Sequence, residues 1–100
     1  MMNDYLTREE VKELSRDIKD RTKHNKHFEL PGSNHRASYY TNEAGELTLM
    51  SYYTNVCKID KAGNFIKLWN NYSATTMKHI NTFRQMAGLE SLNKKEWLAL

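Results

Sequence analysis

The segment Ser51–Phe83, SYYTNVCKIDKAGNFIKLWNNYSATTMKHINTF, constrains the fold more than any other part of the chain. A strand pair, a tight turn and a capped helix follow one another in it almost without spacer. The turn is DKAGN, and the chain returns from it as the strand FIKLWN (65–70), in which side chains alternate between two faces. This run predicts two antiparallel strands with a helix close beside them.

A further strand precedes this segment. The residues ASYYT (37–41) are aromatic or β-branched for the most part, and Gly45 in the following NEAG can take the positive φ of a turn. The chain then runs as ELTLM into SYYTNVCKI, which we interpret as one continuous strand. Because Leu49 and Tyr52 alternate in opposite phases, we expect a bulge or bend near Ser51. Three antiparallel strands is the simplest count.

Both ends of the chain carry helix-start signals. Thr7 and Glu10 form a capping box, which predicts an N-terminal helix that ends near Lys23. Asn93 and Glu96 have the same spacing, so we expect a short helix at the C-terminus. Two apolar side chains of this last segment are expected to dock on the body: Trp97 and Leu100.

A longer helix is predicted between these ends. Ser73 is its N-cap, and Gly88 supplies the left-handed residue that ends it. His79 lies at the boundary of its apolar stripe. The residues expected on the buried stripe are Met77, Ile80, Phe83 and Ala87.

These elements predict a single α+β domain over residues 1–100, with an N-terminal helix, a three-stranded antiparallel sheet, a helix packed on the sheet and a short C-terminal helix. Charged residues make up 27% of the chain and hydrophobic ones 39%, as in ordinary soluble domains. No apolar run approaches the roughly 18 residues that span a bilayer. Cys57 is the single cysteine, which excludes an intramolecular disulfide and is expected in the core. We therefore expect a cytoplasmic protein without membrane contact.

Charge is distributed unevenly along the chain. The formal net charge is +3, and the charges of residues 1–30 cancel, so the whole excess lies beyond Pro31. A bias of this size permits attraction to nucleic acid or to an acidic protein surface and demands neither. It excludes an acidic mimic of DNA.

Aromatic and basic side chains gather in the same part of the sequence. Aromatic faces beside positive charge are typical of single-stranded nucleic-acid binding, but tyrosine is also favoured at protein interfaces. Composition favours the protein-binding interpretation, with DNA or RNA binding as the alternative. The candidate binding residues are Arg36, Tyr40, Tyr53, Lys58, Lys67, Trp69, Tyr72, Lys78, His79 and Arg84.

Residues that could form an anion site, a metal site or a catalytic site have simpler explanations or lack the required pattern. The start of the second helix, with Tyr72, Ser73, Thr75, Thr76 and His79, could hold a phosphate or carboxylate, although helix capping and a hydrogen bond from His79 to the sheet explain the same residues. The histidines His24, His27 and His35 lack the spacing of a zinc site. No nucleophile elbow, phosphate-binding glycine loop or metalloprotease helix is present, so we expect neither catalysis nor a cofactor.

Two stretches of the central segment resemble a pattern found in many small phage and prophage proteins. The pattern is SY-x-T-x-V followed by YS-x-TT-x-x-H-I-x-x-F, and it covers about a third of the chain. Asn55 departs from it, since that position is often apolar in the pattern. The resemblance implies a small accessory gene of a mobile element and brings no agreed activity. The matching positions are Ser51, Tyr52, Thr54, Val56, Ile59, Tyr72, Ser73, Thr75, Thr76, His79, Ile80 and Phe83.

These observations lead to a functional hypothesis. We expect a phage or prophage protein without enzymatic activity that occupies a host protein or nucleoprotein complex in the bacterial cytoplasm, for example a defence nuclease complex, and inhibits or modulates it. Direct binding of DNA or RNA is the alternative. If ASYYT is an edge strand, it could also pair with a second copy and form a homodimer.

Overall fold

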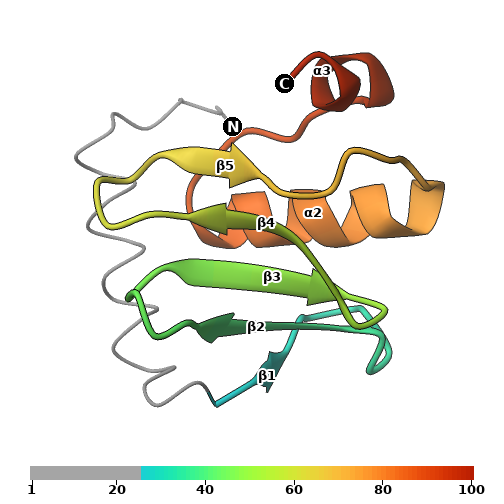
Figure 1. The fold of residues 1–100 in the computed structure, drawn as a ribbon. Helices are drawn as coiled ribbons and strands as arrows, with labels where there is room; N and C mark the ends of the chain where they lie inside the picture. The colour runs from blue at the N-terminus through green and yellow to red at the C-terminus, as the bar shows by residue number, and fades with distance from the viewer. Residues whose placement is uncertain (1–25) are drawn as a thin grey trace.

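The computed structural model describes residues 26–100, which form one five-stranded antiparallel sheet and two helices (Figure 1). The strands lie side by side in the order of the sequence, β1-β2-β3-β4-β5. The predicted helix over Thr7–Lys23 lies outside the described residues. The elements are β1 (Phe28–Glu29), β2 (Ala37–Thr41), β3 (Leu47–Ser51), β4 (Thr54–Ile59), β5 (Phe65–Lys67), α2 (Ala74–Met86) and α3 (Lys94–Leu98).

The prediction of three strands is wrong, first because the chain reverses at Tyr52–Tyr53. Ser51 pairs with Thr54, so the expected continuous strand is a tight hairpin of β3 and β4. Both connecting tyrosines have positive φ, 49° and 69°, which is the backbone of a type I′ turn. That turn normally uses Asn-Gly or Gly-Gly, and two tyrosines give no local signal for it.

The second missed strand is β1, which lies between the predicted end of the first helix near Lys23 and the first predicted strand at residues 37–41. Phe28 pairs with Tyr39, and Glu29 with Ser38. A strand of two residues has no alternation to detect, so only its pairing with β2 reveals it. Because β1 covers this side of β2, the strand ASYYT is not an edge strand, which was the condition for pairing with a second copy through it.

A register shift accompanies the hairpin. Leu49 pairs with Cys57 while the next residue, Met50, pairs with Asn55, so Val56 is an extra residue on β4. Both Val56 and Cys57 are fully buried, as expected where a bulge breaks the alternation. The opposite phases seen in the sequence therefore come from a chain reversal together with this irregularity on the partner strand.

The two predicted helices are confirmed, with their ends where the sequence signals place them. Ser73 accepts a hydrogen bond from the Thr76 N–H, and Asn93 and Glu96 form a reciprocal capping box. After α2, the N–H groups of Gly88 and Leu89 donate to the carbonyls of Gln85 and Arg84, which is the Schellman arrangement. The four residues of the predicted stripe are all buried: Met77, Ile80, Phe83 and Ala87.

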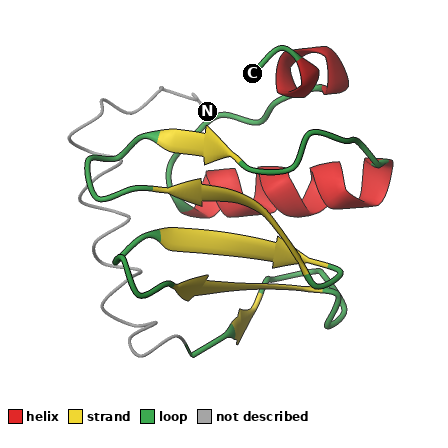
Figure 2. Cartoon of the chain, viewed as in Figure 1, coloured by secondary structure: helices red, strands yellow, loops and turns green. Residues whose placement is uncertain are grey.

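The core lies between one face of the sheet and α2, as Figures 1 and 2 show. Leu47, Leu49, Cys57 and Ile59 supply the sheet side of it. Trp97 of α3 joins the same core and is fully buried, as predicted, whereas Leu100 is 57% exposed and does not dock. The turns and loops that connect the strands lie at the two ends of the sheet (Figure 2).

Candidate binding surface

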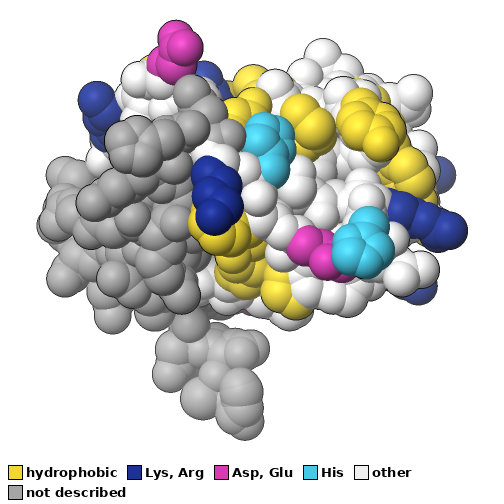
Figure 3. Space-filling view, turned by 90° about the horizontal axis from the view of Figure 1, so that it is seen from below, with side chains coloured by type: hydrophobic (Ala, Val, Ile, Leu, Met, Phe, Trp, Pro, Cys, Tyr) yellow, Lys and Arg dark blue, Asp and Glu magenta, His cyan; other side chains and the backbone are white. Residues whose placement is uncertain are grey.

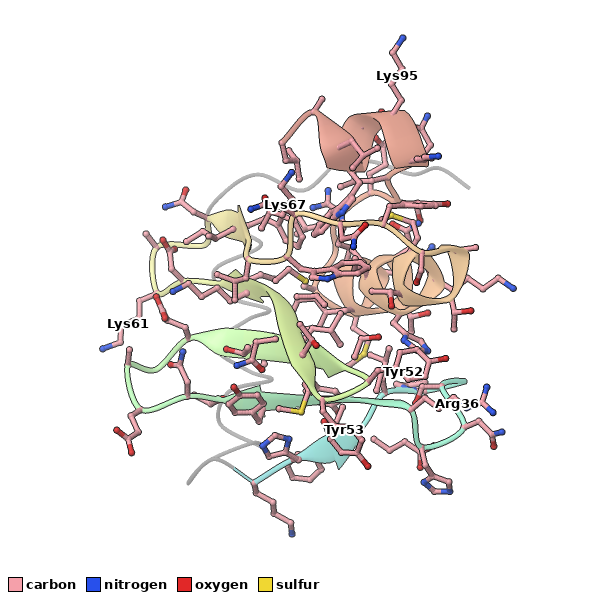
Figure 4. All side chains as sticks on the ribbon, turned by 45° about the vertical axis from the view of Figure 1, so that its right-hand side comes forward. Arg36, Tyr52, Tyr53, Lys61, Lys67 and Lys95 are labelled. Carbon is pink, nitrogen blue, oxygen red and sulfur yellow. The ribbon has the colours of Figure 1, made fainter. Side chains whose placement is uncertain are left out.

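Two turns that contain non-glycine residues with positive φ lie at one end of the sheet. The turn Ser33–Arg36 precedes β2, and the turn Tyr52–Tyr53 connects β3 to β4; they meet where the Tyr52 N–H donates to the Arg36 carbonyl at 2.9 Å. Figure 4 shows Arg36, Tyr52 and Tyr53 together at this end. We call the exposed side chains of His35, Arg36, Tyr52 and Tyr53 the tip surface.

The backbone of the tip surface is strained. Within residues 26–100, the non-glycine residues with positive φ are Asn34, His35, Tyr52 and Tyr53, and all belong to these two turns. Asparagine tolerates this conformation, but for other residues it costs about 1–2 kcal/mol each. Strain of this kind tends to persist where the side chain has a role.

The side chains of the tip surface are open to solvent. Tyr53 is 94% exposed and Tyr52 is 47% exposed, and Arg36 is exposed as well. Arg36, Ser38, Met50 and Tyr53 line a shallow pocket of about 160 Å³. The arrangement offers two aromatic rings, one guanidinium group and a small depression to a partner.

A buried polar cluster lies beneath the tip surface. The Ser51 hydroxyl is 2.8 Å from His79 Nδ1 and 3.1 Å from the Thr76 hydroxyl, so it links the end of β3 to α2. The centroids of the Tyr52 and His79 rings are 5.8 Å apart, and the two rings are tilted by 42° to each other. Burial lowers the pKa of His79, and the positive charge of Arg36 lowers it further, so the imidazole is neutral at neutral pH.

This cluster has a structural role. The Ser51–His79 distance is that of a nucleophile and its base, but Ser51 is only 2% exposed and a substrate could not reach its hydroxyl. The expectation of a hydrogen bond from His79 to the sheet is confirmed. Thr76 adds to that link, while Ser73 caps the helix.

Most of the predicted cations are engaged inside the molecule. Lys58 Nζ lies 2.9 Å from Glu46 Oε1 in a half-buried ion pair, which lowers the pKa of Glu46. Lys67 donates to the Trp97 carbonyl at 3.2 Å. The Arg84 Nε–H donates to the Glu90 carbonyl at 2.7 Å, and its guanidinium lies over the Phe65 ring at 4.4 Å.

The remaining cations do not form one basic surface. Lys78 is exposed on α2. Lys61 and Lys95 lie away from Arg36 in Figure 4, and the face seen in Figure 3 carries its lysine and arginine side chains scattered among other types. On this face the cations of the described residues do not line up as in the basic grooves that bind single-stranded nucleic acid.

Several predicted aromatic residues belong to the body of the fold. Tyr40 stacks on His27 at 4.2 Å and donates to Asn55 Oδ1. Trp69 and Tyr72 are half-buried against the core. Of the ten candidate residues, the structure brings Arg36 and Tyr53 together at the tip surface, with His79 in the cluster beneath.

Tyr52 belongs to the tip surface but was not among the ten candidate residues. A continuous strand would have placed it on a sheet face, whereas the turn places it at an exposed end. The conflict in phase between Leu49 and Tyr52 was the signal that could have found it.

Metal-binding clusters and membrane-spanning helices are both absent from the described residues. Residues 26–100 contain no group of three side chains suited to hold a metal ion. His27 stacks on Tyr40, His35 pairs with Glu29 at 3.0 Å, and His24 lies outside this range. Neither described helix is long and apolar enough to cross a membrane.

Comparison with known proteins identifies a family. The model of a family of unknown function, DUF8033, matches residues 16–99, which include every described strand and helix. No curated protein and no solved structure matches the chain significantly. Since the match extends over well more than half of the sequence, the chain belongs to the DUF8033 family.

Proposed function

We propose that this protein is a non-enzymatic binding protein that contacts another protein through the tip surface. Tyrosine and arginine are the residues most often found at the energetic centre of protein interfaces. The tip surface presents Tyr52, Tyr53 and Arg36 side by side. A tyrosine ring also offers a large contact area at a small loss of rotamer freedom.

The proposal depends most on Tyr53, which combines an exposed side chain with an unfavourable backbone conformation. Its side chain is 94% exposed, so it contributes almost nothing to the core, and its φ of 69° would suit glycine better. A residue that costs stability and buries no surface is best explained by a contact made outside the molecule.

The partner that we propose is a host protein or nucleoprotein complex, for example a defence nuclease complex, whose action the binding inhibits or modulates. The resemblance to small phage and prophage proteins supports this choice. Its motif positions include Ser51, Tyr52, Thr76 and His79, which form the hairpin end and the cluster that supports it. The motif would then preserve the shape of the tip surface in a protein that acts in the bacterial cytoplasm.

Nucleic-acid binding is the weaker alternative. Affinity for a phosphate backbone comes from several cations that neutralise it together. Three of the cations that we expected to serve in this way are bound within the molecule. Lys58 contacts Glu46, Lys67 contacts the Trp97 carbonyl, and Arg84 contacts the Glu90 carbonyl. Arg36 and Lys78 remain exposed.

Affinity capture from a bacterial host lysate tests the proposal. The wild-type protein, Tyr53→Ala and Arg36→Gln are compared with Lys95→Gln, which changes an exposed cation far from the tip surface. We expect one partner to be recovered with the wild type and the control, and to be reduced about tenfold or more with the tip variants. Equal recovery by all four proteins, or no partner at all, contradicts the proposal.

A further inference from the structure

We propose that the tip surface recognises an acidic side chain on its partner protein, with the carboxylate bound by Arg36 beside the Tyr53 ring. This inference rests on the proposed function and adds the chemistry of the contact. The acidic residue would sit at the shallow pocket lined by Arg36, Ser38, Met50 and Tyr53.

The charge of Arg36 is left without a counter-charge in the described part of the chain. No ion pair or side-chain hydrogen bond involves its guanidinium there. The carboxylate of Glu29 on β1, which contacts the loop of Arg36, is already engaged, because Glu29 Oε1 lies 3.0 Å from His35 Nδ1 and Glu29 Oε2 accepts the His35 N–H at 3.0 Å. A planar group with five N–H donors is thus available for a partner.

The backbone that carries Arg36 is held in place on both sides. Its N–H donates to the Ser33 carbonyl at 3.1 Å, and its carbonyl accepts the Tyr52 N–H at 2.9 Å. Ordering this segment on binding therefore costs little, which favours affinity. An arginine matches a carboxylate through two parallel N–H···O bonds, a geometry that a lysine cannot reproduce.

The surroundings suit an amino-acid side chain. Met50 and Tyr53 offer apolar surface to a CH₂ stem, and a volume of about 160 Å³ leaves room for about one side chain. A nucleic-acid strand would instead need several cations along its path, and Arg36 is the one lysine or arginine among the described residues that line this pocket. Charge complementarity therefore favours an acidic protein segment.

Selection from a random peptide library tests this inference, with the folded full chain as bait. We expect the wild-type protein to enrich peptides that contain Asp or Glu. Arg36→Glu should bind those peptides about tenfold or more weakly than the wild type does. As bait it should enrich peptides that contain Lys or Arg instead, because the charge at the contact is reversed. Lys95→Gln serves as the matched control and should select the same peptides as the wild type. Thermal unfolding of each bait verifies that it is folded.

The other outcomes separate this inference from the proposed function. The acidic contact is overturned if Tyr53→Ala loses peptides that carry no acidic residue. It is also overturned if peptides that depend on Tyr53 bind Arg36→Glu as well as they bind the wild type. Both results leave the tip surface as the binding surface. Peptides that bind independently of both Tyr53 and Arg36 overturn both. Salt-dependent binding of a 20-nucleotide oligothymidylate that is lost in Arg36→Gln, with no acidic peptide selected, assigns the surface to nucleic acid and overturns the inference.

Discussion

At the scale of single residues, Tyr53 shows a conflict between stability and exposure. Its left-handed backbone is unfavourable for any residue with a Cβ, and its ring lies in solvent. We expect Tyr53→Gly to raise the free energy of unfolding by about 1 kcal/mol, because glycine relieves the strain at the cost of some unfolded-state entropy. Tyr53→Ala is the control, since it removes the ring and keeps the strain, so its stability should stay close to that of the wild type. Urea unfolding measures all three proteins, and a less stable Tyr53→Gly would contradict this account of the turn.

His79 makes stability depend on pH. Burial lowers its pKa in the folded state below the ordinary value of 6.5, so the unfolded chain binds a proton more readily as the pH falls below 6.5. The contribution of neutral His79 to the stability of the folded state is complete above pH 6.5. It is lost as the pH decreases towards the folded-state pKa. We expect the free energy of unfolding to fall between pH 7.5 and pH 5.5, and this decrease to be smaller in His79→Gln. The same slope in both proteins would show that His79 is not its source.

Cys57 is buried and its chemistry follows from that. Desolvation raises the pKa of its thiol far above the usual range, and its side chain has no exposed surface. We expect the folded protein to resist a thiol reagent such as 5,5′-dithiobis(2-nitrobenzoate), and the protein in denaturant to react fully. Rapid reaction under native conditions would mean that β4 opens readily.

At the scale of elements, the helices depend on local contacts that the sequence displays. Ser73 satisfies the Thr76 N–H in the first turn of α2. Ser73→Ala should lower the free energy of unfolding by about 1 kcal/mol, whereas Thr75→Ala, at an exposed position one residue from Thr76, should change it by less than about 0.5 kcal/mol. Denaturant unfolding of the two variants measures the difference, and equal effects would mean that Ser73 does not act as a cap.

At the scale of the whole molecule, Trp97 attaches the C-terminal helix to the body. Its indole N–H donates to the Asn71 carbonyl at 2.9 Å, the Phe65 ring meets it edge-on, and Lys67 lies over its face. Trp97→Ala should cost about 3–5 kcal/mol of unfolding free energy, as for other buried aromatic residues. Leu100→Ala, which changes an exposed side chain of the same segment, should leave the thermal midpoint nearly unchanged. A small effect at Trp97 would imply that α3 is not part of the cooperative unit.

The sequence by itself determined the local features of this protein. Helix caps at Ser73, Asn93 and Gly88 and the glycine turn at Gly45 are made by residues close together in the chain, so their spacing predicts them. The tertiary structure alone decided the rest. The turn of two tyrosines is local, but it lacks the glycine or asparagine that would signal it. The two-residue strand β1 and the meeting of Arg36 with Tyr52 depend on pairing between segments apart in the chain, for which a single sequence carries no period or motif. The same holds for Lys67, whose contact with Trp97 spans thirty residues and removes it from the surface that we had expected it to serve.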